Sequence, residues 1–261
     1  MWLRVSGLTM RYLFLYRRSL VRAGEIFFWP VMDLVVWGFL TAYLKTMVVP
    51  QAVVYLLGAL IFWDVLYRSQ QAITLSVTEE IWTKNLLNIF LSPVTTFELM
   101  LSTCMIGIIK SLLTATTLGL LALMFYDFNL LDVGIALAPF MASLLLFGWA
   151  VGMCTTALVL RFGQSAEALV WGIPFLIQPF SAVFYPVDVL PGWLQIVARA
   201  LPSTYVFEGM RQALDGDGLN WSQLLISFGL NAVYLAAGAT FFVWMLGVVR
   251  DRGYLSRLGM E

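Results

Sequence analysis

The fold is decided by residues 171–214, WGIPFLIQPFSAVFYPVDVLPGWLQIVARALPSTYVFEGMRQAL. This stretch begins as an apolar run and is then interrupted by Pro186, Pro191 and Pro202, with two short apolar pieces after the first interruption. Apolar pieces of roughly 10–14 residues are too short to cross about 30 Å of hydrocarbon and are typical of re-entrant or interfacial segments. Interrupted backbone at membrane depth is tolerated where protein or a water-lined cavity satisfies its polar groups. We therefore predict a re-entrant segment, about residues 186–214, that helps to wall a pathway at one membrane face.

The composition of the whole chain is that of an integral membrane protein. Of its 261 residues, 61% are hydrophobic and 11% are charged, and the mean hydropathy is +0.88, whereas soluble domains are about 45–50% apolar. The formal net charge is zero, which predicts no nucleic-acid partner. The chain has no histidine, and its two cysteines lie apart inside apolar runs. Hydrolytic chemistry is therefore disfavoured, and we predict no catalytic residue and no metal site.

Hydropathy predicts an all-α membrane protein with a surface helix followed by six transmembrane helices. Residues 1–25 place arginines between apolar residues at near-helical intervals, which is typical of a basic amphipathic helix lying on a membrane. The six-span domain occupies residues 26–261. Each of its apolar stretches is near or above the roughly 20 residues needed to cross, and they lie at about residues 26–48, 53–75, 99–126, 133–160, 166–185 and 224–249.

The distribution of basic residues predicts which side faces the cytoplasm. Six spans put both chain ends on one side, and lysine and arginine are enriched in cytoplasmic loops. If both ends are cytoplasmic, the outer side holds only Lys45, Arg199 and Arg211. The cytoplasmic side then holds most of the basic residues, namely Arg4, Arg11, Arg17, Arg18, Arg22, Arg68, Lys84, Arg161, Arg250, Arg252 and Arg257.

The longest predicted cytoplasmic connection, residues 76–98, contains a short amphipathic helix at about residues 79–90. Thr78 is a typical N-cap, two glutamates follow it as an acidic first turn, and apolar residues then recur at helical spacing. Pro93 ends the helix. The helix either ties two spans together or offers an amphipathic face to a soluble partner, and the sequence favours neither interpretation.

The charged residues Asp33, Asp64 and Lys110 fall inside predicted spans. Because a charge facing lipid costs a few kcal/mol or more, each must face protein or water. They serve either as substrate or proton contacts or as structural pairs. Asp33 and Lys110 lie at similar depths, so that an ion pair between them is geometrically feasible, and we favour the structural role.

Aromatic residues make up 15% of the chain and have two interpretations. Tryptophan and tyrosine near span ends are usually interfacial anchors, and we favour anchoring or packing for most of them. The alternative is that they line a pathway. The residues to which this applies are Trp29, Trp37, Trp63, Phe175, Phe180, Phe184, Tyr185, Trp193, Tyr205 and Phe207.

The order of these features, together with three short motifs, resembles a known family. The motifs are Leu91-Ser92-Pro93-Val94 after the amphipathic helix, Leu190-Pro191, and Pro202-Ser203-Thr204-Tyr205 followed by Arg211. In this respect the chain is similar to the ABC type-2 permeases, the membrane subunits of ATP-binding-cassette exporters for polysaccharides, drugs and nodulation factors. The resemblance covers nearly the whole chain.

The resemblance implies a non-catalytic permease subunit in a bacterial or archaeal plasma membrane. The chain has no GxxxxGK[ST] phosphate loop, so two copies of a separate ATPase would carry the ATP and Mg²⁺, and a second, identical permease would complete the pathway. The resemblance places ATPase coupling on Glu79, Glu80, Trp82, Lys84, Leu86, Leu87 and Asn88, and we expect a pathway or outer gate at Phe180, Phe184, Tyr185, Tyr205 and Arg211. The alternative function is an ATP-independent secondary transporter or channel, which would show trains of intramembrane charges or interrupted repeats.

Overall fold

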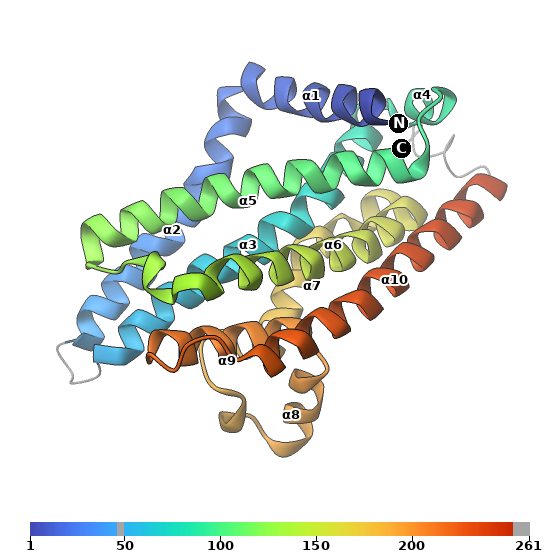
Figure 1. The fold of residues 1–261 in the computed structure, drawn as a ribbon. Helices are drawn as coiled ribbons and strands as arrows, with labels where there is room; N and C mark the ends of the chain where they lie inside the picture. The colour runs from blue at the N-terminus through green and yellow to red at the C-terminus, as the bar shows by residue number, and fades with distance from the viewer. Residues whose placement is uncertain (46–49, 253–261) are drawn as a thin grey trace.

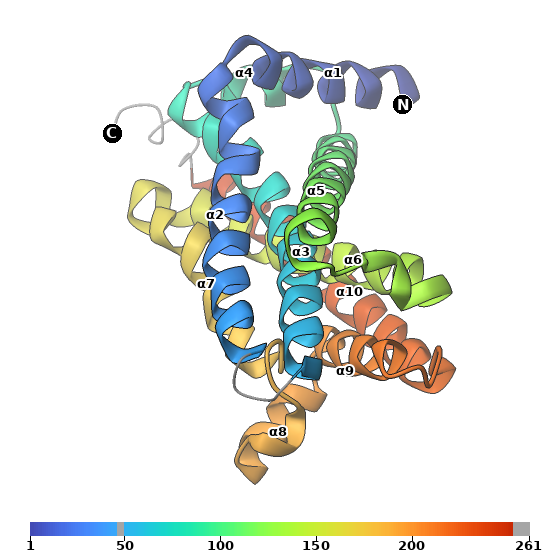
Figure 2. The ribbon, with the colours of Figure 1, turned by 90° about the vertical axis from the view of Figure 1, so that its left-hand side faces the viewer.

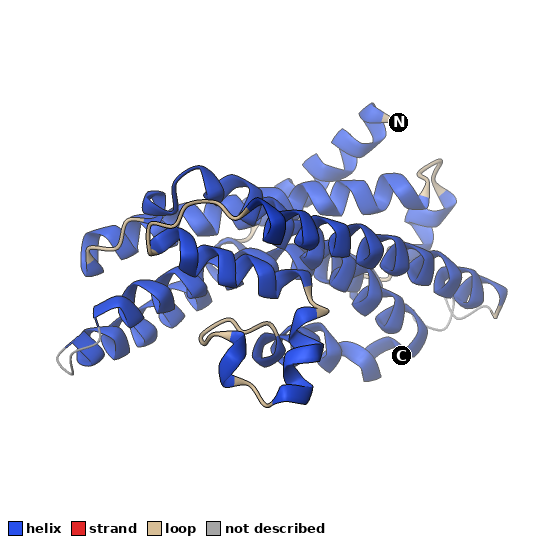
Figure 3. Cartoon of the chain, turned by 60° about the horizontal axis from the view of Figure 1, so that its bottom comes forward, coloured by secondary structure: helices blue, strands red, loops and turns tan. Residues whose placement is uncertain are grey.

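The computed structural model describes residues 1–45 and 50–252, and this part of the chain is helical with no strand. The expected all-α class is therefore confirmed. Short 3₁₀ turns lie at Leu130–Ala136, Gly163–Ala166 and Val187–Val189. The α-helices, which Figure 3 shows joined by short loops, are α1 (Trp2–Arg18), α2 (Leu20–Lys45), α3 (Pro50–Trp82), α4 (Leu86–Leu91), α5 (Thr96–Tyr126), α6 (Leu137–Phe162), α7 (Glu167–Phe180), α8 (Gly192–Arg199), α9 (Pro202–Leu214) and α10 (Trp221–Asp251).

Helix α3 is the centre of the bundle. It packs along α5 and α6, α10 packs along the far side of α6, and α2 lies beside α3 (Figure 1). Figure 2 shows α1 and α4 together at one end of the molecule and α8 at the opposite end, with α2, α3 and α7 running between them. These ends are called the α4 end and the α8 end below. Apolar residues from the ends of α3, α6 and α10 meet α4 in one core cluster, so these helices also reach the α4 end.

Four helices in the described part of the chain are long and apolar enough to cross a membrane. They agree with four of the predicted spans and comprise Arg22–Thr41, Thr96–Tyr126, Leu130–Phe162 and Trp221–Asp251. Helix α3 covers the predicted span 53–75, but it carries buried polar and charged residues along much of its length. Helix α7 has 14 residues, about 21 Å at 1.5 Å per residue, and is shorter than the predicted span 166–185.

Close approach of α6 to α3 depends on two glycines one turn apart. A Cβ atom on Gly148 would lie 2.6 Å from the carbonyl oxygen of Leu66, and one on Gly152 would lie 3.0 Å from that of Gln70. Such G-x-x-x-G spacing lets the backbones of membrane helices meet. The two glycines thus allow α6 to lie directly against the backbone of α3.

The segment after α7 folds back into the main core. Phe207 and Met210 of α9 are fully buried in the cluster that also contains Phe62 and Phe140. Ser227 of α10 donates a hydrogen bond to the Pro202 carbonyl oxygen at 2.8 Å. The predicted segment 186–214 is therefore two helices joined by short turns, of which α9 packs inside the bundle.

The predicted helix boundary at Thr78, near the α4 end, is wrong. The segment 79–90 is not one helix capped by Thr78, because α3 continues through Trp82 and the Thr78 hydroxyl donates to the Thr74 carbonyl oxygen at 2.7 Å. The apolar face of α3 extends to Ile81, which is buried, so the helix gains by continuing. Lys84 then adopts a left-handed φ of 55° in the turn before α4.

The N-terminal segment 1–25 is divided as well. Ser19 has an extended backbone and ends α1, and residues 20–25 begin α2. Residues 46–48 of the first predicted span and Arg257 lie outside the described residues.

Candidate functional site

Helix α1 is held against the bundle by ion pairs with glutamates of α3 and α5. Arg11 makes a two-pronged contact with Glu80, with nitrogen-to-oxygen distances of 2.6 and 2.8 Å. Arg4 lies 3.2 Å from Glu98, which the N-terminal amine also approaches at 3.7 Å. Arg22, at the start of α2, lies 3.3 Å from Glu79. These contacts are called the α1 clasp.

The Arg11–Glu80 pair is the best-formed member of the α1 clasp. Glu80 is only 2% exposed, and a bidentate guanidinium–carboxylate contact is stronger than a single hydrogen bond. The hydrogen bond with Glu80 raises the pKa of Arg11 above its ordinary value. Tyr12, the next residue of α1, is also buried. Charge and packing therefore both hold α1 in place.

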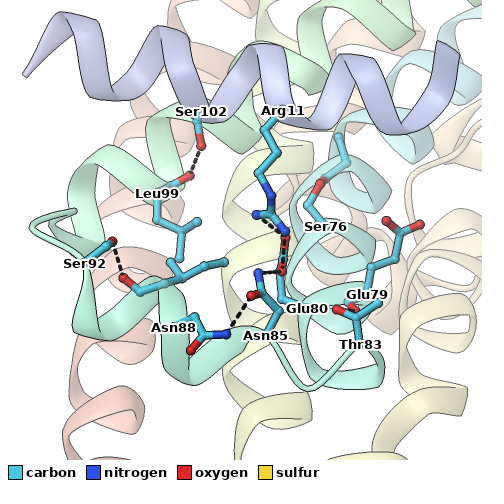
Figure 4. Close-up of polar contacts among 12 residues, drawn as sticks. Arg11, Ser76, Glu79, Glu80, Thr83, Asn85, Asn88, Ser92, Leu99 and Ser102 are labelled. Atoms are coloured by element: carbon cyan, nitrogen blue, oxygen red, sulfur yellow. Dashed lines mark hydrogen bonds and ion pairs between the residues drawn. The ribbon is translucent and has the colours of Figure 1, made fainter. Parts of the chain in front are cut away.

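Helix α4 is connected to the α1 clasp through the turn that precedes it. Asn88 donates to the side-chain oxygen of Asn85 at 3.1 Å, and Asn85 donates to Glu80 at 2.7 Å. Figure 4 shows this chain of contacts from α4 through Glu80 to Arg11. These contacts connect α4 with α1.

The predicted coupling residues divide into buried and exposed groups. Glu80 belongs to the α1 clasp, and Leu86 is buried in the core at 5% exposure; Leu86 is therefore not a surface docking residue, because the inner face of α4 packs on α3. The Leu87 side chain lies outside the described part of the structure. The residues that face outward are Trp82, Lys84 and Asn88, together with Leu91, which the prediction did not include.

A cavity of about 730 Å³ lies between α2, α3 and α7. All three predicted intramembrane charges, Asp33, Asp64 and Lys110, line it. An Asp33–Lys110 ion pair was feasible from the sequence, but within residues 1–45 and 50–252 these two side chains form none. Lys110 instead donates to the Tyr16 hydroxyl and lies 4.2 Å from the centre of its ring.

Arg68 was predicted on the cytoplasmic side, but it lies in the middle of α3. It forms an ion pair with Asp64 at 3.3 Å and is only 7% exposed. The spacing i, i+4 on one helix brings the two side chains together. The pair explains how two charges are accommodated inside the bundle.

The wall of the cavity is rich in aromatic side chains. Trp37 of α2 stacks on Phe184 at 4.6 Å between ring centres. Tyr67 of α3 meets Phe175 of α7 at 5.8 Å. A pathway role was the alternative interpretation for ten aromatic residues. Five of them line the cavity: Trp29, Trp37, Trp63, Phe175 and Phe184.

Other predicted outer-gate residues hold the α8 end together and do not line this cavity. Arg211 donates to the carbonyl oxygens of Ala182 and Val183, at 2.9 and 3.2 Å, and pairs with Glu208 at 3.1 Å. Tyr205 donates to the Arg199 carbonyl oxygen at 2.9 Å. Tyr185 donates to that of Pro179 at 2.6 Å. Phe180 is half-buried at the end of α7.

Sequence reasoning missed one face of α3 as a site. The residues of α3 that line the cavity recur every three or four positions, and this periodicity could have identified the face. They are Leu60, Trp63, Asp64, Tyr67, Arg68, Gln71, Leu75 and Glu79. Sequence reasoning also missed cavity-lining residues on other helices, which have no comparable signal because they come from distant parts of the chain. They include Tyr16, Arg22, Glu25 and Trp171.

The cavity and the α1 clasp are continuous, since Arg22 and Glu79 belong to both. The described part of the chain thus combines four helices long and apolar enough to cross a membrane with a charged, aromatic cavity between helices. Residues 41–248 match the family model for ABC-2 family transporter proteins. This chain therefore belongs to the ABC-2 transporter family, whose members are membrane permeases of ABC transporters. No curated protein matches the chain.

Proposed function

We propose that this chain is the permease subunit of an ABC exporter that moves a glycan, lipid, drug or similar amphiphile out of the cytoplasm. The proposal depends on the continuity between α4, the α1 clasp and the cavity. An exposed surface at the α4 end is thereby connected mechanically to a space that is large enough for a small molecule. We expect ATP and Mg²⁺ on two copies of a separate ATPase, and a second copy of this chain beside the first.

The proposed orientation places the α4 end in the cytoplasm. Basic residues gather at this end, as the positive-inside tendency requires. In the described part of the chain they are Arg4, Arg11, Arg17, Arg18, Arg22, Lys84, Arg161, Arg250 and Arg252. We further propose that α3 and α7 cross the membrane along with the four long apolar helices, so that the protein is multi-pass with six spans in a bacterial or archaeal plasma membrane.

The proposed coupling path starts where the ATPase would contact Trp82, Lys84, Asn88 and Leu91. Movement of α4 would pull on Glu80 through Asn85, and Arg11 would carry the movement to α1. The adjacent Glu79–Arg22 pair would transmit it to α2. Because α2 forms one wall of the cavity, such a movement would change the access of a substrate.

Co-purification tests this proposal. The tagged chain is purified in mild detergent from cells that also produce candidate ATPases, and bound ATPase and ATP hydrolysis are measured. Trp82→Ala combined with Leu91→Asp should reduce both, because it changes only exposed side chains at the α4 end. The matched control is Trp193→Ala with Val189→Asp, which changes exposed residues at the α8 end and should leave both unchanged. Equal behaviour of the two variants would refute the proposed docking surface.

An ATP-independent secondary transporter is the second candidate. It is favoured by the gathering of Asp33, Asp64 and Lys110 at one cavity, since ionisable residues inside a membrane often mark ion pathways. Transport into vesicles that contain the chain alone, driven by an imposed ion gradient without ATP, would support this candidate. Transport that requires both ATP and a second protein would exclude it.

A further inference from the structure

The cavity has the dimensions and the mixed wall of a small-molecule site. Its volume of about 730 Å³ falls within the roughly 300–1,000 Å³ that is typical of ligand pockets. The walls come from α2, α3, α5 and α7, so a ligand inside would touch the helices that the proposed coupling path moves. The chemistry of those walls therefore indicates which class of molecule fits.

The cavity wall has a surplus of negative charge. Each of its cationic side chains is already engaged: Arg22 with Glu79, Arg68 with Asp64, and Lys110 with the Tyr16 hydroxyl. Two further carboxylates, Glu25 and Asp33, also line the cavity. Within the described residues, neither forms an ion pair. The wall therefore carries one more carboxylate than cation. The carboxylates are Glu25, Asp33, Asp64 and Glu79, and the cations are Arg22, Arg68 and Lys110.

Asp33 is the carboxylate that most requires a partner. It lies in α2, inside a segment that is long and apolar enough to cross a membrane, and its side chain is exposed and lines the cavity. An unpaired carboxylate in the hydrocarbon region of a bilayer is costly. A bound cation would remove this cost.

Asp64 offers a second site of negative charge deeper in the wall. It is 8% exposed, and one of its oxygens lies 3.3 Å from Arg68. Its other oxygen, Oδ2, is buried without a hydrogen-bond partner. A buried acceptor without a partner is unfavourable, so Arg68 leaves part of this carboxylate unsatisfied.

The aromatic wall is suited to the same kind of ligand. Two of its rings already have protein cations beside them, Tyr16 with Lys110 at 4.2 Å and Tyr67 with Arg68 at 5.8 Å. The indoles of Trp29, Trp63 and Trp171 also line the cavity, and no cation lies over any of them in the described part of the chain. Indole is the best side chain for binding a cation through its π face.

We propose that this cavity binds an organic cation with a hydrophobic body. Asp33 and Asp64 supply the opposite charge, and the tryptophans supply the aromatic faces. The inference builds on the proposed function, because it names the substrate class of the same permease. It concerns binding to the chain alone, however, and can therefore be tested without an ATPase.

The experiment uses two probe ions of equal shape and opposite charge, tetraphenylphosphonium and tetraphenylborate. Equilibrium binding of each is measured to the full-length chain in lipid nanodiscs, and binding to empty nanodiscs is subtracted. We expect the phosphonium to bind at least tenfold more tightly than the borate. Asp33→Asn and Trp63→Leu should each weaken phosphonium binding about tenfold, and the control Asp188→Asn, an exposed carboxylate at the α8 end, should not.

Asp33→Asn is the main variant because, among the residues that the structure describes, Asp33 forms no ion pair whose loss would disturb folding. Asp64→Asn is the second, and an unchanged elution volume on size-exclusion chromatography would show that it remains folded. Equal affinity for the two ions, a preference for the borate, or phosphonium binding that Asp33→Asn leaves unchanged would each overturn the proposal. If phosphonium fails to bind while ATPase co-purification still depends on Trp82 and Leu91, the substrate class is wrong and the permease function stands.

Discussion

The contact between α3 and α6 gives a quantitative prediction for Gly148→Ala. The new methyl group would lie 2.6 Å from the Leu66 carbonyl oxygen and 2.8 Å from the Ser69 hydroxyl oxygen, whereas ordinary contacts begin at 3.4 Å. The Leu66 atom is backbone and cannot rotate away, so the two helices must separate locally. Overpacking of this kind costs about 1–3 kcal/mol.

The same change should weaken a hydrogen bond between the helices. The Ser69 hydroxyl donates to the Leu145 carbonyl oxygen at 2.8 Å, and the new methyl group would crowd the Ser69 side chain. A typical hydrogen bond contributes about 0.5–1.5 kcal/mol. Together with the overpacking, and less the gain of up to about 1 kcal/mol from replacing glycine by alanine in a helix, we expect Gly148→Ala to lower the free energy of unfolding by about 1–3 kcal/mol.

Unfolding in mixed micelles with increasing SDS, followed by tryptophan fluorescence, would measure this loss. The matched control is Gly229→Ala in α10, where a Cβ atom meets nothing within 4 Å. The control should be neutral or stabilising by up to about 1 kcal/mol, because alanine favours helix over glycine. If the two variants unfold at the same SDS fraction, α6 does not lie against the α3 backbone as described and the reasoning is refuted.

Further predictions concern the α1 clasp and the α8 end. Arg11→Glu should lower ATP-dependent transport into inverted vesicles, and adding Glu80→Arg should restore part of it, because the pair makes a direct contact; full transport by the single variant would contradict the clasp. Arg211→Gln should speed amide hydrogen exchange across residues 182–190 and destabilise the protein by about 2–4 kcal/mol, since a buried cation donates to two carbonyl groups. Tyr205→Phe removes one hydrogen bond and should cost about 1 kcal/mol while ATPase co-purification is unchanged; loss of co-purification would place this end on the cytoplasmic side.

Much of the helical framework could be predicted from the sequence because it depends on local hydropathy. The long apolar helices α5, α6 and α10 lie close to their predicted positions. Predictions failed at Thr78 and Ser19, where packing decides the boundary. The apolar face of α3 continues past Thr78 into the core, and the basic segment bends at Ser19 so that α1 reaches the glutamates of α3 and α5.

The candidate site could be predicted only in part. The sequence identified Asp33, Asp64 and Lys110 as residues that must avoid lipid, because charge in hydrocarbon is costly wherever it occurs. It suggested the wrong partners, since depth along a span does not reveal which face of a helix meets its neighbour. The i, i+4 spacing of Asp64 and Arg68 was the available signal, and it was missed because Arg68 had been counted among the cytoplasmic basic residues.

The sequence by itself determined the class of protein, the all-helical fold and the basic character of the α1 segment, because these follow from composition and from periodicity over neighbouring residues. Only the tertiary structure decided which residues share the cavity and the α1 clasp. Arg11 and Glu80 are 69 residues apart in the chain, and Trp37 reaches Phe184 across an even longer separation. Such contacts depend on how helices rotate and pack against one another, which is set by close approaches such as that of Gly148 to Leu66 and not by local preference.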